Sequence, residues 1–190
     1  IVATGPLSSH NIIENLEKIT GEKMFSFFDA CAPIVEKNSI DFNKAYFKSR
    51  YEQGDNSYIN CAMNKEEYET FYNELINAEL ADTHDFDKNY FEGCMPIEVM
   101  ARRGEKTLRY GPLKPMGLRR TPEDRPYAVV QLRQDNVIGS LYNIVGFQTN
   151  LTYSEQKRVF SLIPGLENAK YVRYGLMHRN TYICAPKHLN

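Results

Sequence analysis

The sequence predicts a protein of the α/β class that also contains a section of mixed helices and β-strands (α+β). Near the start, residues 1–4 read as the end of a buried strand, a turn and a helix follow, and residues 24–28 again favour a strand. A strand, turn, helix, strand order is typical of an α/β layer. Farther along, a helix over residues 64–76 precedes two β-rich runs, at 127–134 and 141–149, which favours an α+β arrangement.

The first helix is predicted from its cap, its apolar period and its stop signal. Ser9 is a favourable N-cap residue, and Gly21 is typical of the position just past a helix C-terminus. Residues 41–51 fit either a helix or irregular structure, and the turn cluster at 54–57 suits a domain boundary. The apolar residues that recur with helical period are Ile12, Ile13, Leu16 and Ile19.

Two capping boxes predict the starts of later helices. Asn64 with Glu67 follows a strand-like run at 58–63, and Thr152 with Glu155 precedes a helix that Pro164 and Gly165 are expected to end. Between them, residues 107–126 are rich in Pro and Gly and are predicted to form a loop with at most short strands. The two β-rich runs form a predicted hairpin, and residues 169–184 read as extended chain.

Composition excludes several classes of protein. Apolar residues make up 42% of the chain and the mean hydropathy is −0.51, as in a globular protein. No apolar run approaches the roughly 20 residues of a spanning helix, and no export signal is seen, so we expect a cytoplasmic protein without membrane contact. No two cysteines form a CxxC pair, which argues against a structural zinc site or a disulfide scaffold. Free thiols and no bound metal are expected; the cysteines are Cys31, Cys61, Cys94 and Cys184.

The small net charge of −1 conceals a strong asymmetry along the chain. Residues 52–92 hold eleven acidic residues against two lysines, whereas residues 102–125 hold eight basic residues against three acidic ones. The second stretch therefore attracts polyanions. Because Tyr110 and several prolines interrupt its cations, it suits a surface that binds phosphates and stacks on an unpaired base, although a solvated charged face is the common alternative.

Cys94 is the sharpest candidate for chemistry. It lies just before a short helix predicted over residues 96–103, where free backbone N–H groups favour a thiolate. The nearby carboxylates of Glu92 and Glu98 act in the opposite direction. A small buried packing residue is the alternative reading of Cys94. His178 stands where polar residues follow an apolar strand, and a structural histidine is the alternative there.

Eight segments, in order from one end of the chain to the other, resemble the folate/FAD-dependent tRNA (uracil-5)-methyltransferase family. The part at residues 148–169 also resembles a sister flavoprotein that modifies wobble uridines, but 91–98 and 177–181 favour the methyltransferase family. The segments are TGPL (4–7), SRY (49–51), YINC (58–61), FEGCMPIE (91–98), YAVVQLR (127–133), VGFQTNL (145–151), IPGLENA (163–169) and MHRNT (177–181).

The resemblance implies part of a discontinuous FAD-binding domain, at residues 1–57 and 151–190, interrupted by a mixed helix and sheet insertion domain at 58–150. It also implies that N- and C-terminal parts of the same polypeptide, including the GxGxxG motif, lie outside this chain, so that the fragment alone is expected to be inactive. The implied reaction forms 5-methyluridine in the T-loop of tRNA, at uridine 54. Its implied cofactors are 5,10-methylenetetrahydrofolate as carbon donor, reduced FAD as reductant and NAD(P)H as the source of electrons.

The resemblance also implies roles for individual residues. Cys94 matches the insertion-domain cysteine and is expected to add to C6 of the uracil, with general acid or base catalysis as its other possible role. The turn at Thr4 and Gly5 and the segment of His178, Arg179, Asn180 and Thr181 are expected to contact flavin and folate. We expect the tRNA phosphates to contact Arg102, Arg103, Lys106, Arg109 and Lys114.

Two other functions fit the sequence. One is that of the sister flavoprotein, which the identity of the modified uridine distinguishes. The other is a tRNA-binding module without catalysis.

Overall fold

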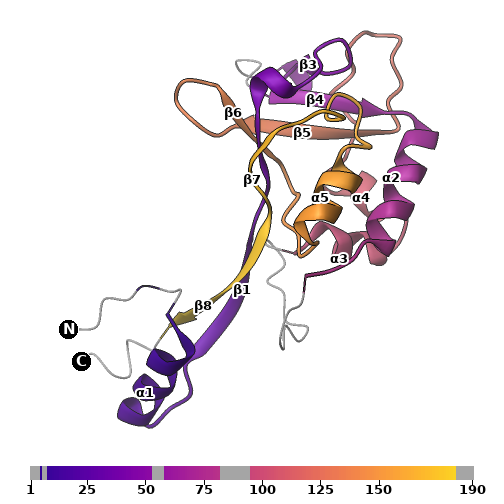
Figure 1. Ribbon diagram of the computed structural model, residues 1–190. Coiled ribbons are helices and arrows are strands. Elements are labelled where there is room, and N and C mark those ends of the chain that lie inside the picture. Colours follow the sequence, from indigo (N-terminus) through magenta and orange to yellow (C-terminus); the bar gives the residue numbers. More distant parts are fainter. Residues whose placement is uncertain (1–4, 6–7, 53–57, 82–94, 183–190) are drawn as a thin grey trace.

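The computed structural model describes residues 5, 8–52, 58–81 and 95–182. Its larger body consists of a six-stranded sheet with helices, and a two-stranded ribbon extends from this body to a separate helix (Figure 1). The described part thus combines helices with antiparallel strands, as the sequence predicts for its middle section.

The sheet of the larger body has the strand order β3-β4-β5-β6-β2-β7, and all of its neighbouring strands are antiparallel. The predicted hairpin is confirmed as β5 and β6, with Leu132 opposite Ile144. The predicted strand before it is β4, which pairs with β5 over its whole length. The strands are β2 (Ile34–Glu36), β3 (Tyr46–Phe47), β4 (Tyr58–Met63), β5 (Ala128–Gln134), β6 (Leu141–Ile144) and β7 (Tyr171–Arg173).

Four helices lie on one side of this sheet (Figure 1). The capping box of the first is complete: the Glu67 N–H donates to Asn64 Oδ1 at 2.9 Å, and the Asn64 N–H donates to Glu67 Oε2 at 2.7 Å. In the last helix Thr152 Oγ1 accepts from the Glu155 N–H, but that helix ends well before Pro164. The helices are α2 (Lys65–Asn77), α3 (Ile97–Arg102), α4 (Thr107–Tyr110) and α5 (Tyr153–Phe160).

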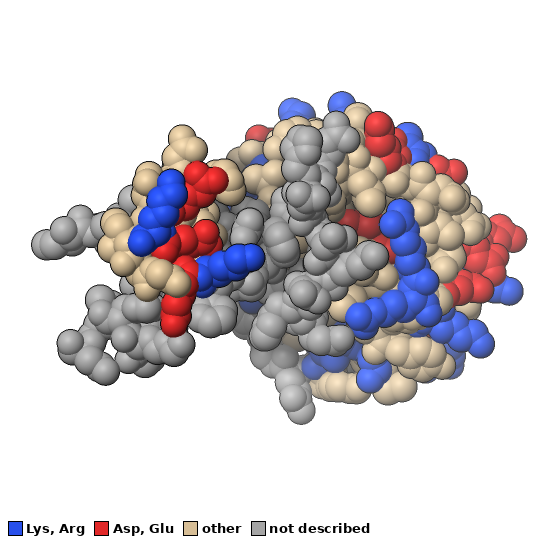
Figure 2. Space-filling model, turned by 90° about the horizontal axis from the view of Figure 1, so that it is seen from below, with Lys and Arg blue, Asp and Glu red and all other residues tan. Residues whose placement is uncertain are grey.

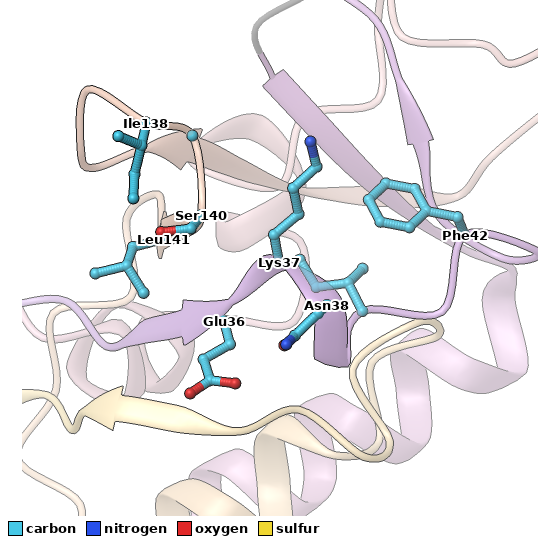
Figure 3. A pocket seen from close by; sticks show the side chains of 9 residues that line it. Glu36, Lys37, Asn38, Phe42, Ile138, Ser140 and Leu141 are labelled. Carbon is cyan, nitrogen blue, oxygen red and sulfur yellow. The ribbon is translucent and has the colours of Figure 1, made fainter.

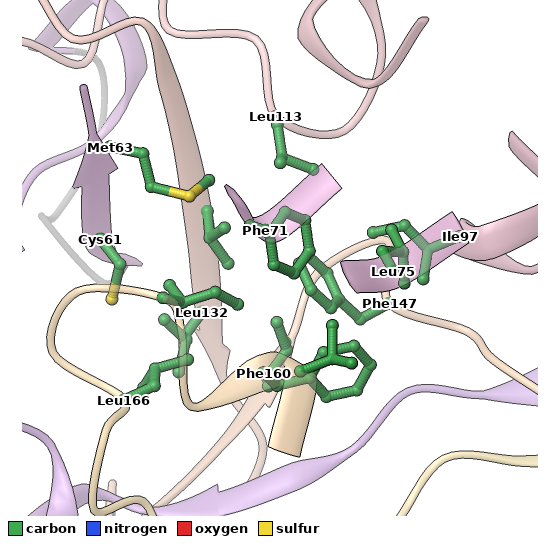
Figure 4. Packing of buried hydrophobic residues seen from close by; sticks show 14 of the residues in the cluster. Cys61, Met63, Phe71, Leu75, Ile97, Leu113, Leu132, Phe147, Phe160 and Leu166 are labelled. Atoms are coloured by element: carbon green, nitrogen blue, oxygen red, sulfur yellow. The ribbon is translucent and has the colours of Figure 1, made fainter. Parts of the chain in front are cut away.

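The core lies between the sheet and these helices, and Phe147 is at its centre (Figure 4). The Phe147 ring packs edge-on against Phe160 with 5.1 Å between ring centroids, and Phe71 of α2 lies 6.0 Å from Phe147. Cys61 on β4 is also fully buried, as expected, and burial raises the pKa of its thiol, which keeps it protonated and unreactive.

The ribbon consists of β1 (Phe25–Cys31) and β8 (Leu176–Tyr182), paired antiparallel from Phe25 opposite Tyr182 to Cys31 opposite Leu176. At its far end lies α1 (His10–Thr20), which ends as predicted with Gly21 in the left-handed conformation and its N–H on Glu17 O. Ser9 occupies the N-cap position without a side-chain hydrogen bond. Of the apolar face, Ile13 is buried but Ile19 is 79% exposed.

Residues 41–51, for which the sequence allows a helix or irregular structure, form irregular structure apart from β3. Two short 3-10 turns flank that strand: η1 (Lys37–Ser39) before it and η2 (Arg50–Glu52) after it. The stretch at 107–126 differs from the expected loop at one point, because α4 forms a helical turn. Its Leu108 side chain is buried in the core, and this burial stabilises a turn that local propensity does not favour.

The sheet crosses both domain boundaries expected from the sequence, at 57/58 and 150/151. β2 and β3 precede the first boundary and β7 follows the second, yet all three hydrogen-bond within the same sheet. The turn cluster at 54–57 lies outside the described residues.

Replacing Phe147 by Ala is expected to lower the free energy of unfolding by about 3–5 kcal/mol, because it leaves a cavity between two aromatic rings in the core. Urea denaturation of this variant measures the effect. Val137→Ala, at a side chain that is 99% exposed, is the control and should change the same quantity by less than about 0.5 kcal/mol. Equal effects of the two substitutions would contradict the packing described for Phe147.

Candidate functional site

The structure describes the predicted site residues unevenly. Cys94 and Thr4 lie outside the described residues. Gly5 has a φ of 73°, and a Cβ at this position would meet no atom of the described residues within 4 Å, so that part of the chain leaves its backbone open to close approach. His178, Arg179 and Asn180 lie on β8, where the backbone of His178 is opposite Asp29.

Thr181 follows them on β8, opposite Ser26. Its hydroxyl is buried and has no hydrogen-bond partner among the residues that the structure describes. A buried hydroxyl without a partner is uncommon, because leaving it unpaired costs free energy. Thr181 is therefore the residue of the predicted cofactor segment that shows unused hydrogen-bonding capacity.

The short helix predicted after Cys94 is confirmed as α3, with Pro96 at its N-cap. Met95, Pro96 and Ile97 are buried, and the Ile97 N–H donates to Gln148 O at 2.7 Å. The backbone that directly follows Cys94 is therefore fixed against the protein interior. The helix end is not free to move as part of a surface loop.

Glu98, in the first turn of α3, is a buried carboxylate that binds a neighbouring segment. Its Oε1 accepts the Asn150 N–H at 2.8 Å, and its Oε2 accepts the Thr149 hydroxyl at 2.8 Å. Burial raises the pKa of the Glu98 carboxyl, and these hydrogen bonds oppose that rise only in part.

The hydrogen-bond partners of Ile97 and Glu98 are residues 148–150. They belong to a stretch at 148–152, which we term the junction segment. This segment also accepts the Ala81 N–H at Asn150 O (2.8 Å), and its Thr152 N–H donates to Glu79 O (3.1 Å). The junction segment therefore holds the end of α2 and the start of α3 together, although it lies far from both helices in the sequence.

Gln156 of α5 connects the junction segment to the base of the ribbon. Its Nε2 donates to Leu151 O at 2.8 Å and to Gly175 O at 2.9 Å, while its Oε1 accepts the Gly175 N–H at 2.7 Å. A Cβ at Gly175 would lie 2.6 Å from the methyl group of Thr149, so only Gly fits there. The ribbon begins at a position fixed by these contacts.

The predicted RNA-binding cations fall into two groups. Arg102, Arg103 and Lys106 are exposed at the end of α3 and just after it. The view from below shows Lys and Arg side chains side by side on the larger body, with acidic side chains close to them (Figure 2). Arg102 Nη2 also donates to Ile76 O at 3.2 Å.

Arg109 and Lys114 form the second group, because they line one concave surface, which we term the basic recess. It has a volume of about 320 Å³. Two further cations line it, Arg119 and Arg125, which the sequence places in the basic stretch without singling them out. The complete lining is Arg109, Tyr110, Lys114, Pro115, Met116, Gly117, Arg119, Arg125 and Pro126.

Another recess, of about 560 Å³, lies between η1 and the β5–β6 hairpin, and the sequence did not predict it. Figure 3 shows the Lys37 side chain extending between Ile138 and Phe42. The Phe42 ring stacks on Phe47 at 5.4 Å, and Lys37 Nζ lies 5.3 Å from the Phe47 ring centre. Its only charged lining residues are Glu36 and Lys37, and this opposite-charge pair gives it no preference for anions.

Comparison with known proteins identifies the family. The model of the family described as "Glucose inhibited division protein A" matches residues 1–190. The chain belongs to this family. Among solved structures, Aquifex aeolicus GidA in its form II crystal has a TM-score of 0.52 over 90% of this chain and 26% of that chain, at 14% identity. This likeness shows a shared fold.

Several curated relatives are much more similar in sequence. A protein of Lactobacillus helveticus named methylenetetrahydrofolate–tRNA-(uracil-5-)-methyltransferase TrmFO is 62% identical over 98% of the chain, and one of the same name from Acetivibrio thermocellus is also 62% identical over 98%. The chain spans 46% and 43% of these two proteins, so it covers less than half the length of either.

Two features are absent from the described residues of the chain. No helix there has the length and apolar content to cross a membrane. No group of three or more His, Cys, Asp or Glu side chains in that part of the chain could hold a metal ion.

Glu98 gives a pH prediction with a defined sign. Because burial raises its pKa above the ordinary 4.5, the folded state binds this proton more tightly than the unfolded chain does. The free energy of unfolding should therefore fall as pH rises from about 4.5 through the raised pKa. Glu98→Gln keeps an oxygen for the Asn150 N–H but carries no proton to lose.

The stability of Glu98→Gln minus that of the unsubstituted protein should thus increase over this pH range. Urea denaturation between pH 4.5 and 8 measures both proteins, and the difference cancels the contributions of all other titrating groups. Stability curves that run parallel across the range would show that Glu98 keeps an ordinary pKa in the folded state.

Proposed function

We propose that the complete polypeptide containing this chain is a folate- and flavin-dependent tRNA (uracil-5)-methyltransferase. The observation that carries the proposal is the identity of 59–62% over 98–100% of the chain with proteins that have this name. Such identity extends through all eight segments that resemble the family. The proposed product is 5-methyluridine in the T-loop of tRNA.

The proposed architecture is a discontinuous FAD-binding domain with this larger body as its insertion. The ribbon of β1 and β8 supports this division, because it leaves the body as two antiparallel strands, the geometry of an insertion that departs and returns at one place. Since β2, β3 and β7 belong to the sheet of the body, we place the insertion at about residues 32–175. The exposed Ile19 of α1 fits a helix that packs on further parts of the FAD-binding domain.

The predicted cofactor segments fit a bound cofactor in two respects. Gly5 leaves open space where a side chain would otherwise stand, and the buried Thr181 hydroxyl lacks a partner that a polar cofactor group can provide. We assign Thr4, Gly5 and residues 178–181 to this pocket. When bound, methylenetetrahydrofolate supplies the one-carbon unit and FAD, reduced by NAD(P)H, supplies the reducing equivalents.

Cys94 is proposed as the nucleophile. Addition of its thiolate to C6 of uracil makes C5 carbanion-like, so that C5 can bond to the one-carbon unit before a base removes the C5 proton. The packing of Met95, Pro96 and Ile97 supports this role, because it fixes the backbone that follows the cysteine. The target base must leave its stack to reach a thiol, which favours an RNA loop as substrate.

The complete polypeptide is expected to transfer a methyl group to C5 of one T-loop uridine when supplied with tRNA, methylenetetrahydrofolate, FAD and NADPH. Mass spectrometry of nuclease fragments identifies the modified position. Modification confined to the wobble uridine would instead assign the activity of the sister flavoprotein.

Cys94→Ser in the complete polypeptide should abolish the covalent complex with tRNA that contains 5-fluorouracil, since the hydroxyl is a far weaker nucleophile than the thiolate. Denaturing electrophoresis detects the complex. Cys31→Ser is the matched control, because Cys31 is a half-exposed free thiol on the ribbon, and it should trap the RNA normally. Undiminished trapping by Cys94→Ser would remove Cys94 from the nucleophile role.

A further inference from the structure

Among the described residues, the basic recess is lined by four cationic side chains, those of Arg109, Lys114, Arg119 and Arg125, and by no acidic one. Two of the four have structural contacts. Arg109 stacks 3.4 Å above the Tyr127 ring and donates to Tyr127 O at 2.8 Å, and one nitrogen of Arg125 donates to the carbonyls of Pro122 and Asp124. The side chains of Lys114 and Arg119 make no hydrogen bond or ion pair with any described residue, so both cations are available to an external anion.

The loop that presents Lys114 is held in place by another arginine, Arg50, which does not line the recess. Arg50 donates to the carbonyls of Met116 and Lys114 and to Gln131 Oε1. The Tyr51 N–H donates to Gly117 O at 3.2 Å, and a Cβ at Gly117 would lie 2.9 Å from the Tyr51 ring. Leu113 and Leu118 anchor both ends of the loop in the interior. The recess therefore has a preformed shape, which distinguishes it from a flexible run of charges.

An apolar surface adjoins the two available cations. The Tyr110 side chain, 78% exposed, and Met116, 59% exposed, both line the recess. The Tyr110 ring stacks on no other aromatic ring of the described chain, and its hydroxyl makes no hydrogen bond there. An exposed aromatic ring next to cations is the combination that binds a nucleotide, because the cations contact the phosphate and the ring stacks on the base.

We propose that the basic recess binds one nucleotide of the tRNA, with Lys114 and Arg119 at a phosphate and Tyr110 stacked on an unpaired base. This inference rests on the proposed function for its RNA and adds a defined subsite, in which Arg119 is a new member and Tyr110 has a specific role. Arg102, Arg103 and Lys106, which are also exposed, directly precede the recess in the chain. An acidic peptide would use the cations equally well, but it would gain nothing from the free Tyr110 ring.

The test measures binding of unmodified tRNA to the complete polypeptide by fluorescence anisotropy at a series of salt concentrations. Lys114→Ala and Arg119→Ala should each weaken binding and reduce the slope of log Kd against log salt by roughly 0.7–0.9, the value for one phosphate contact. Lys65→Ala is the matched control. It removes an exposed cation on the acidic helix α2, where Lys65 pairs with Glu69 at 3.4 Å, and it should leave both quantities unchanged.

Tyr110 separates stacking from charge. Tyr110→Ala should weaken tRNA binding about tenfold with no change in the salt slope, and Tyr110→Phe should bind as the unsubstituted protein does. In the methylation assay, Tyr110→Ala should raise KM for tRNA and leave kcat unchanged, because the proposed subsite contributes to binding the RNA and takes no part in the chemical step. Circular dichroism and melting temperature verify that each variant folds.

The outcomes separate this inference from the proposed function. Failure of the unsubstituted protein to bind or methylate tRNA would overturn both. Normal methylation, with Lys114→Ala and Arg119→Ala binding like the control, would overturn only the recess. Normal tRNA binding by Tyr110→Ala, together with poly-L-glutamate competing as strongly as RNA of equal charge, would identify a site for acidic polypeptides and overturn the nucleotide assignment.

Discussion

The larger body depends on the pairing of buried polar groups around the junction segment, residues 148–152. Glu98 accepts two hydrogen bonds from it, and Gln156 donates both to it and to Gly175. Each of these groups would cost free energy if it were buried alone, so the packing of helices against the sheet is favourable only in the one arrangement that satisfies all of them. Apolar burial around Phe147 provides most of the driving force, but it is not directional. The polar contacts therefore select the arrangement.

One consequence is that two candidate site segments, distant from each other in the sequence, share a common support. The start of α3, which directly follows Cys94, bonds to Gln148, Thr149 and Asn150, while the base of the ribbon bonds to Gln156, which also binds Leu151. The junction segment thus sets the position of α3 relative to the ribbon. If the ribbon leads to the flavin domain, as proposed, the same contacts fix where the insertion presents its cysteine toward the flavin. A reaction among a thiol, a base and two cofactors requires such fixed placement.

Local signals in the sequence predicted the elements that local interactions determine. The Asn64 and Glu67 capping box, the Gly21 stop and the β5–β6 hairpin each depend on residues within a few positions of one another. Strands β2, β3 and β7 have only two or three residues, too few to show an alternating pattern, and β2 pairs with strands more than 100 residues away. For this reason the domain boundaries expected from the sequence, at 57/58 and 150/151, fall between strands that belong to the same sheet. The hydrogen bonds between Gln156 and Gly175 likewise cannot be predicted from the local sequence of either residue.

The basic stretch illustrates how far composition predicts a site. Its excess of cations indicated a polyanion surface, and Arg109 and Lys114 do line a recess, but nothing in the sequence pattern distinguishes Arg119 from its neighbours. The choice depends on Arg50, which lies more than 60 residues earlier and uses its guanidinium to bind loop carbonyls. Because Arg50 satisfies those carbonyls, Lys114 and Arg119 need not do so, and their charges remain available. Arg50 thus has a structural role, whereas Lys114 and Arg119 can bind a ligand. A count of charges along the chain does not distinguish these two kinds of cation.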